Sequence, residues 1–357
     1  MRVVGIDPGT VSIDLCGLDD GELVLDRSIP TERALADPQD FARQLKEAKP
    51  DLVAGPSGYG LPLTRVADAD DRAIRLAYLA AAGERGGIGG LRALALALAE
   101  AELPVLFTPG VIHLPSVPAH RKVNRVDLGT ADKVCAAALG IHEQVLRRGC
   151  AIGEASFVLL EIGGAFSAAI AVNGGQIVDG MGGTSGPLGM RASGALDGEV
   201  AFLAGHVPKG MLFRGGATTI AGERALSPER FGEPATPRER LAWNAFMESA
   251  VKAVATMCAI VPHPREILLS GRLVHVEPLA RELHLRLSPY GDVHRLQGFA
   301  TTAKEAAQGA ALIADGLAGG RHQALTDSLG IREARGTALD HLYVISPADA
   351  LRRLGLR

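Results

Sequence analysis

The sequence has little of what would place the protein in several specialised classes. It holds only four cysteines, which are far apart and form no CxxC pair, so neither a zinc site nor a disulfide framework is indicated. The net charge at pH 7 is −3, which gives no general electrostatic attraction to nucleic acid or to membranes. The cysteines are Cys16, Cys135, Cys150 and Cys258.

Targeting and membrane-spanning patterns are also missing. The chain starts directly with a predicted strand, without a basic segment followed by an apolar one. The most apolar helix candidate, residues 91–103, is shorter than a membrane span and contains Arg92, Glu100 and Glu102. We therefore expect a cytoplasmic protein. Its 357 residues suffice for two domains.

The first motif is an apolar strand that ends at an acid and a glycine turn. "VVGIDPGT" at 3–10 runs from the predicted strand into Asp7, Pro8 and Gly9. A second strand over 11–18, a turn at 19–22 and a third strand from 23 follow. Taken alone, the motif has three interpretations, which are a phosphate-binding hairpin, a metal-binding carboxylate of a nuclease, or an ordinary turn.

The same pattern returns later in the chain at an offset of 154 residues. "GIDPGTVSIDLCGLDDGELV" matches "LEIGGAFSAAIAVNGGQIV" without a gap, so that Asp7 falls on Glu161 and Gly9 on Gly163. The turn glycine Gly21 likewise falls on Gly175. Two gapless copies of one hairpin indicate an internal duplication.

Paired turns of this kind suit a polyphosphate. Glycine turns expose backbone N–H groups to phosphate oxygens, and an acid at the strand end suits Mg²⁺ or its water shell. Asp7 and Glu161 are therefore the predicted metal ligands, although a turn aspartate is the plain alternative for Asp7. The predicted phosphate and nucleotide residues of the two turns are Asp7, Gly9, Thr10, Glu161, Gly163 and Gly164.

Two further segments carry candidate catalytic residues. "HRKVNRVDLGTADK" at 120–133 offers basic side chains, including Arg125, for an anionic substrate, and Asp127 as a base or metal ligand. Its alternative is a solvated loop with a helix N-cap at Thr130. Arg191, in a glycine-flanked loop, suits a transition-state phosphate contact, and a loop salt bridge is the alternative.

Together these motifs resemble the acetate and sugar kinase, Hsp70 and actin superfamily, and most closely the butyrate kinases and their archaeal relatives. The resemblance rests on "LVAGPSGYGLPL", "VLLEIGGAFSAAIAVNGGQIVD", "GTSGPLGMRASGALD", "ILLSGRL" and "KEAAQGAALIADGLAGG", in this order over about 300 residues. It implies an α/β fold with two duplicated ribonuclease-H-like, actin-like ATPase lobes and a central nucleotide cleft. The implied domains are an N-terminal lobe (1–150), a C-terminal lobe with the nucleotide site (151–320), and an extension (321–357) packing back on the N-terminal lobe.

The resemblance also implies roles for single residues. The essential arginine of acyl kinases falls on Arg191, and the acid of their closing helix falls on Glu305, for which a helix-dipole role is the alternative. The adenosine motif falls on Ser270, Gly271 and Arg272. This chain departs from the acyl-kinase pattern where Pro56 replaces an arginine and Glu161 replaces a histidine.

We therefore expect an ATP- and Mg²⁺-dependent kinase that phosphorylates a small carboxylate. Its partner would be a small-molecule substrate, with no nucleic acid and no membrane, and the resemblance implies a homodimer. A nucleotide-binding regulator or ATPase without acyl-kinase activity is one alternative. A resolvase-like nuclease is another, but the strand where its second acid would lie ends in glycine and proline at 55–56.

Overall fold

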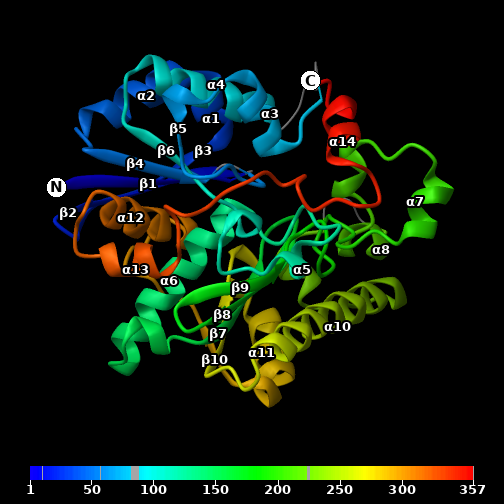
Figure 1. Cartoon of the computed structure of the whole chain (residues 1–357). Coiled ribbons are helices and arrows are strands. Elements are labelled where there is room, and N and C mark those ends of the chain that lie inside the picture. Colours follow the sequence, from blue (N-terminus) through cyan, green and yellow to red (C-terminus); the bar gives the residue numbers. More distant parts are fainter. Residues whose placement is uncertain (10, 57, 82–87, 223–225, 357) are drawn as a thin grey trace.

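The computed structural model describes residues 1–9, 11–56, 58–81, 88–222 and 226–356, and it forms two α/β lobes, one above the other in Figure 1. The first sheet has the order β3–β2–β1–β4–β6–β5, and the second has the order β11–β10–β7–β8–β9. In both sheets an antiparallel three-strand meander continues into parallel strands. The predicted fold class, a two-lobed duplicated α/β protein, is thereby confirmed.

The strands are β1 (Arg2–Pro8), β2 (Ser12–Asp19), β3 (Glu22–Pro30), β4 (Leu52–Pro56), β5 (Thr64–Arg65), β6 (Val105–Thr108), β7 (Phe157–Ile162), β8 (Ser167–Asn173), β9 (Gln176–Met181), β10 (Glu266–Ser270) and β11 (Asp292–Arg295). The helices are α1 (Thr31–Ala36), α2 (Pro38–Glu47), α3 (Asp71–Tyr78), α4 (Ile88–Glu100), α5 (Ala119–Lys122), α6 (Ala131–Arg148), α7 (Gly198–Ala204), α8 (Ala217–Ala221), α9 (Pro228–Phe231), α10 (Pro237–Ile260), α11 (Glu277–Leu287), α12 (Glu305–Leu317), α13 (Gln323–Ser328) and α14 (Pro347–Arg353).

The two meanders share their irregularities as well as their order. The β2–β3 pair shifts register between Gly17 and Leu18, and the β8–β9 pair shifts at the matching place, between Ala171 and Val172. Each pair is closed by a two-residue turn with positive φ at both positions, 20–21 and 174–175. Such turns match the right-handed twist of a hairpin. The sequence repeat is therefore a repeat of backbone geometry.

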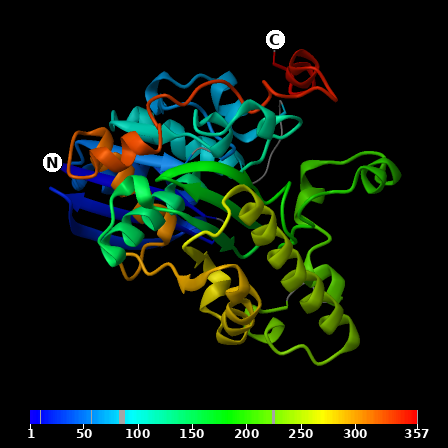
Figure 2. The ribbon, with the colours of Figure 1, turned by 60° about the horizontal axis from the view of Figure 1, so that its bottom comes forward.

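Helices and sheets alternate in layers (Figures 1 and 2). Side chains on β1 alternate, so that Val3 belongs to the central hydrophobic cluster while Val4 and Ile6 face the cluster with α2 and α4. On β7, Leu159 likewise faces the central cluster and Leu160 faces the cluster with α10 and α11. The central layer, made of α6 and α12, therefore packs between the two sheets.

Helix α12 packs on the first sheet, although it lies within residues 151–320, the predicted C-terminal lobe. It follows the second sheet in sequence but packs on β1, β2 and β4 of the first. This close packing requires glycine, because a Cβ at Gly5 would lie 2.2 Å from the backbone of α12. At Gly309 a Cβ would lie 1.8 Å from the carbonyl oxygen of Cys135 on α6. The alanine- and glycine-rich sequence of α12 makes the approach possible.

The extension after residue 320 runs along the first lobe. Arg335 N–H donates to the carbonyl oxygen of His113, and the side chain of Asn124 accepts from the N–H groups of Tyr343 and Val344. Near the C-terminus, Arg75 donates to the carbonyl oxygen of Leu354. These bonds attach the extension mainly by its backbone.

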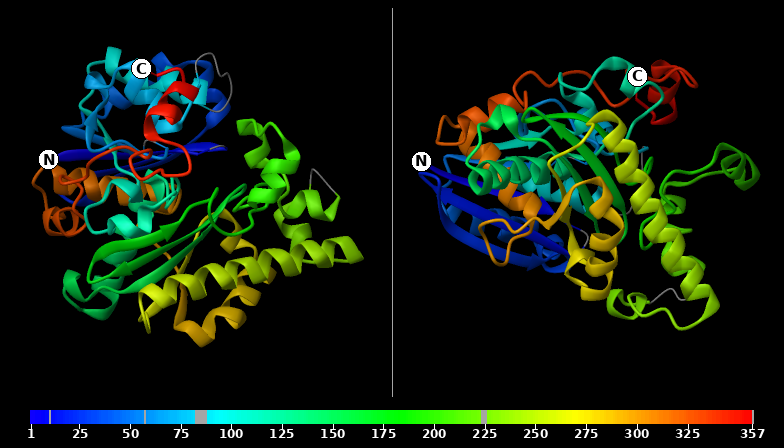
Figure 3. Two further views of the ribbon diagram at one scale, coloured as in Figure 1. Left: turned by 45° about the vertical axis from the view of Figure 1, so that its right-hand side comes forward. Right: turned by 90° about the horizontal axis from the view of Figure 1, so that it is seen from below.

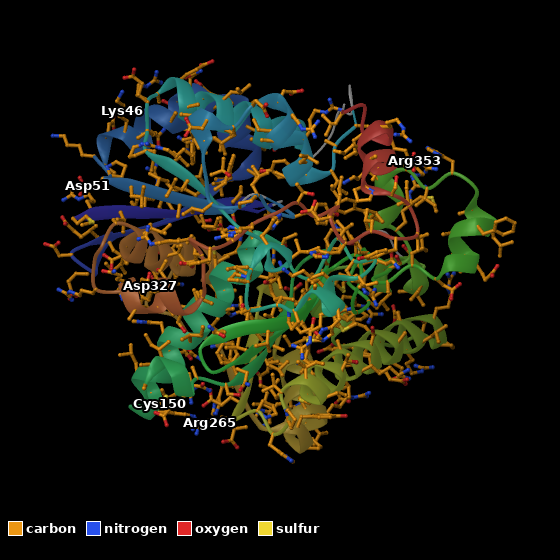
Figure 4. The ribbon with its side chains drawn as sticks, viewed as in Figure 1. Lys46, Asp51, Cys150, Arg265, Asp327 and Arg353 are labelled. Carbon is orange, nitrogen blue, oxygen red and sulfur yellow. The ribbon has the colours of Figure 1, made fainter. Side chains whose placement is uncertain are left out.

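The outer surface carries charged side chains, and two of the four thiols, those of Cys150 and Cys258, are partly exposed. Lys46, Asp51 and Cys150 lie around the outside of the molecule in Figure 4. All four cysteines are free, in agreement with the spacing in the sequence. Among the described residues, no helix is both long and apolar enough to span a membrane.

Candidate active site between the lobes

A cavity of about 810 Å³ is lined by residues of both lobes. The ends of β1, β7 and β10 and the first residues of α6 and α12 meet there. It thus collects most of the predicted site residues, namely Asp7, Gly9, Asp127, Glu161, Gly163, Gly164, Ser270, Gly271, Arg272 and Glu305. Thr10 lies outside the described residues. Arg125 and Arg191 are described but are not part of the lining.

The second turn, residues 163–166, presents free amides. Gly163 N–H donates to the carbonyl oxygen of Phe166 (2.9 Å), which closes the turn. In the described part of the chain, the N–H groups of Gly164 and Ala165 donate to no other backbone group. A Cβ built on Gly164 meets nothing within 4 Å. This turn can therefore receive an anion.

The first turn is held from outside. Gly9 N–H donates to the carbonyl oxygen of Asp7 (3.0 Å), so this amide is already used within the turn. The hydroxyl of Thr31 donates to the carbonyl oxygen of Gly9 (2.7 Å). The backbone N–H of Thr31 donates to the carbonyl oxygen of Val11 (3.0 Å). The start of α1 therefore fixes both sides of the turn.

Lys133 on α6 bridges two carboxylates that line the cavity. Its Nζ lies 2.5 Å from Oδ2 of Asp132 and 2.8 Å from Oε1 of Glu161. Burial alone would lower the pKa of the ammonium, but the two carboxylates raise it above its usual value. For Glu161 burial dominates and raises the pKa, against the effect of Lys133. A permanent positive charge thus lies beside the second turn.

Asp7 is the most perturbed acid of the site. Burial, and next the charge of Asp132, raise its pKa to about 7, although Lys304 and Lys133 act in the opposite direction. Asp132 shows the reverse behaviour, because Lys133 and the hydroxyl of Thr130 outweigh burial and lower its pKa. That hydroxyl donates to Asp132, and Thr130 makes no side-chain cap for α6. The two acids therefore share one electrostatic environment.

Lys304 places a second ammonium near the first turn. Its Nζ lies 2.6 Å from Oδ2 of Asp14 and 2.6 Å from the hydroxyl of Ser12. Asp14 is fully buried, and its other oxygen has no hydrogen-bond partner in the described part of the chain. Because loss of the ammonium would leave the buried carboxylate of Asp14 without a counter-charge, this ion pair holds Lys304 at the N-terminus of α12.

The Ser270–Arg272 segment closes another side of the cavity. Gly271 has φ +90°, and a Cβ there would lie 2.7 Å from the carbonyl oxygen of Ile162. Glycine is therefore required where β10 passes the end of β7. The hydroxyl of Ser270 is buried with no partner among the described residues, so it can donate to a ligand. Arg272 is exposed and lines the cavity.

Asp127 is a well-satisfied acceptor. Its Oδ2 accepts from the N–H (2.9 Å) and the hydroxyl (2.8 Å) of Thr184, and its Oδ1 accepts from Gly129 N–H (3.2 Å). Burial nevertheless raises its pKa above the usual value. A Cβ at Gly182 would lie 1.7 Å from its carboxylate. Asp127 therefore fixes the glycine-rich 182–185 segment against the first lobe.

The predicted catalytic arginines, Arg191 and Arg125, lie outside the cavity lining. Arg191 is exposed, and its N–H donates to the carbonyl oxygen of Ala165 (3.1 Å), so its backbone supports the second turn. Arg125 is also exposed. Its charge opposes the rise that burial causes in the pKa of Asp179, a residue that does not line the cavity.

The carboxylates at the cavity suit a magnesium ion that phosphate oxygens also bind. The described residues contain no group of three or more His, Cys, Asp or Glu side chains that could hold a metal alone. Mg²⁺ beside phosphates, however, needs only one or two carboxylates and water. Asp7 and Asp132 repel each other, and a dication would relieve this. Both Asp132 and Glu161, the other predicted ligand, also pair with Lys133.

Four important residues were not among the predicted ones. Asp132 and Lys133 belong to the same "GTADK" motif as Thr130, and Lys304 directly precedes Glu305. Asp14 falls on Ala168 in the repeat, so the repeat gave no signal for it. Only the alternation of strand residues, which points Asp14 to the same side of the sheet as Ser12, offered a clue.

Comparison with solved structures supports the same fold. Acetate kinase from Entamoeba histolytica matches with a TM-score of 0.59 at 9% identity, over 81% of this chain and 87% of that one. A propionate kinase from Francisella tularensis matches at 0.60 and 12%, over 86% and 98%. Acetate kinase from Porphyromonas gingivalis matches at 0.57 and 13%, over 87% and 98%. At these identities the similarity establishes the fold alone.

Sequence comparisons add a family. No curated protein matches the chain. A family profile described as "Protein of unknown function (DUF1464)" matches residues 5–344. This range includes both turns, the Ser270–Arg272 segment and the lysines of the cavity. Because it covers nearly the whole chain, the protein belongs to the DUF1464 family.

Proposed function

We propose that the protein is an ATP- and Mg²⁺-dependent phosphotransferase whose acceptor is a small carboxylate, which it converts to an acyl phosphate. The observation that carries this proposal is the pair of turns at one cavity, each preceded by a carboxylate at the end of a central strand. The solved structures of similar fold include acetate and propionate kinases, which supports the choice of acceptor.

In this proposal the protein acts by positioning and by neutralising charge. The free amides of Gly164 and Ala165 bind phosphate oxygens, and Lys133 supplies a positive charge beside them. The hydroxyl of Ser270 and the side chain of Arg272 bind the nucleoside part. Mg²⁺, held by Asp7 and Asp132, would neutralise charge on the phosphates.

The transfer itself requires no base. A carboxylate oxygen of the acceptor attacks the γ-phosphorus, and the bond from that phosphorus to the β–γ bridging oxygen breaks, which releases ADP. Because a carboxylate is already ionised at neutral pH, no proton moves. Asp127, whose two oxygens accept three hydrogen bonds, then has a structural role. Arg191 and Arg125 do not line the cavity in this structure, so we propose that they contact the transferred group only when the lobes close. Glu305, at the start of α12, is the proposed acid near the phosphates.

Incubation of the purified protein with Mg-ATP, hydroxylamine and a panel of carboxylates tests this function. Acyl hydroxamate formation with one acid, dependent on ATP, supports the proposal. ATP binding without hydroxamate from any acid contradicts it and favours a nucleotide-binding regulator or ATPase. That second candidate is favoured by two observations, namely the pairing of Glu161 with Lys133 and the exposure of Arg191.

A nuclease is disfavoured by the donor set. Two-metal nucleases need several converging carboxylates, and the described residues form no such group. Metal-dependent cleavage of branched DNA would reverse this judgement. We further propose, from the superfamily resemblance, a cytoplasmic homodimer without nucleic-acid or membrane partners. Sedimentation of the purified protein measures the oligomeric state.

A further inference from the structure

One side of the cavity is aromatic, in a chain poor in aromatic residues. Tyr59, Tyr78 and Phe166 all line the cavity, although the whole chain has only four tyrosines. The three rings come from different elements, namely the loop after β4, the end of α3 and the second turn. Phe213 packs edge-on against Phe166, with ring centroids 4.8 Å apart. We call Tyr59, Tyr78 and Phe166 the aromatic wall.

The second lobe holds the aromatic wall in place. Segment 193–216, which carries α7, projects from that lobe (Figure 3). From it, Lys209 donates to the carbonyl oxygen of Tyr78 (2.8 Å), and its Nζ lies 5.2 Å from the ring centroid of Tyr59. Tyr59 is further fixed by its N–H, which donates to the carbonyl oxygen of Ala77 (2.9 Å). The wall is thus preformed by both lobes.

One polar group near the wall already has a partner within the protein. The hydroxyl of Thr184, which acts on the pKa of Tyr59, donates to Asp127. At Gly58, which has φ +68°, a Cβ would lie 2.6 Å from the ring of Tyr78, so this ring packs closely on the backbone. A wall made of three rings favours a flat apolar acceptor over a polyhydroxylated one.

The wall also adjoins the reacting end of the cavity. Phe166 is the last residue of the second turn, whose free amides face the phosphate position. A ring against Phe166 therefore places a short carboxyl-bearing arm beside that turn. Resting on the proposed phosphotransferase function, we propose that the acceptor is a carboxylic acid with an aromatic ring, which stacks against Tyr59, Tyr78 and Phe166.

The experiment compares phenylacetate with acetate and butyrate. Hydroxamate formation gives kcat/KM for each acid, and calorimetry in the presence of Mg-ADP gives the affinity for each acid without turnover. We expect phenylacetate to bind and react at least about tenfold better than butyrate. Tyr59→Leu should raise KM for phenylacetate about tenfold or more and leave KM for ATP unchanged. Tyr343→Leu, an exposed tyrosine of the extension, is the matched control.

The outcomes separate the two proposals. If butyrate or acetate reacts as well as phenylacetate, the aromatic acceptor is wrong and the phosphotransferase stands. If phenylacetate binds and Tyr59→Leu weakens this binding, but no acid yields hydroxamate, the aromatic subsite stands and the proposed reaction is wrong. Absence of phenylacetate binding overturns the inference, as does an equal effect of Tyr59→Leu and Tyr343→Leu.

Discussion

Lys133 and Glu161 connect α6 to the end of β7 by an ion pair of 2.8 Å on the floor of the cavity. Their side chains are 12% and 16% exposed, so water screens the pair little. Lys133 also binds Asp132, which shares the environment of Asp7. The same ammonium therefore links the layers of the fold and the acids of the site.

Lys133→Met should destabilise the protein, because it leaves Glu161 buried without its cation. We expect a loss of about 2–4 kcal/mol in the free energy of unfolding, measured by urea denaturation. The double variant with Glu161→Gln should recover part of this loss. Lys252→Met breaks an exposed pair with Glu248 and should cost at most about 0.5 kcal/mol. Equal losses in the two lysine variants would contradict the assignment.

Asp7 should give the stability a recognisable pH dependence. Its folded-state pKa, about 7, lies above the unfolded value, so the folded protein keeps a proton that the unfolded chain releases. Stability therefore falls as pH rises from about 4 to about 7 on account of this group. Asp7→Asn should remove that fall and stabilise the protein by about 1–3 kcal/mol near pH 8.

The check for Asp7 is urea unfolding of both proteins near pH 5 and near pH 8. The variant should gain more relative to the parent at the higher pH than at the lower pH, and it should lose nucleotide turnover if Asp7 holds Mg²⁺. A stability difference that is the same at both pH values would show that the pKa of Asp7 is not raised.

Two glycines of the cavity should respond oppositely to alanine. Gly271→Ala forces a Cβ to 2.7 Å from the carbonyl oxygen of Ile162 at φ +90°, so we expect a loss of roughly 2 kcal/mol or more in stability. Gly164→Ala meets no atom within 4 Å and should fold normally, but its methyl group would crowd a phosphate on the second turn. Thermal unfolding and ATP titration distinguish the two effects. Normal ATP affinity in Gly164→Ala would argue against this turn as the phosphate site.

Arg191→Ala tests the arginine that the family resemblance singles out. Its side chain is exposed, and its backbone bonds to Ala165 survive the change, so stability should change by less than about 0.5 kcal/mol. If Arg191 contacts the transferred group, kcat should fall about 100-fold with an unchanged KM for ATP. Arg265→Ala, on the outside of the molecule in Figure 4, is the control. A kcat within about threefold of the parent would remove Arg191 from the mechanism.

The sequence by itself determined the repeated part of the fold. The gapless match between 5–24 and 159–178 sets strand alternation, turn position and bulge position together, because each depends on local backbone geometry. The turns that follow Asp7 and Glu161 could therefore be paired from the sequence, whereas the Ser270–Arg272 segment was assigned through the family resemblance.

The tertiary structure alone decided which charges meet. Lys133 reaches Glu161, and Lys304 reaches Asp14, from 28 and 290 residues away, and no local pattern encodes such pairs. The return of α12 to the first sheet depends on Gly5 and Gly309, whose small size matters only at a contact between distant segments. Arg191 is a case where the local sequence and the packing differ. Its glycine-flanked loop predicted a phosphate contact in the cavity, but its side chain is exposed to solvent. Local periodicity follows from short-range sterics, whereas ion pairing depends on how the layers stack.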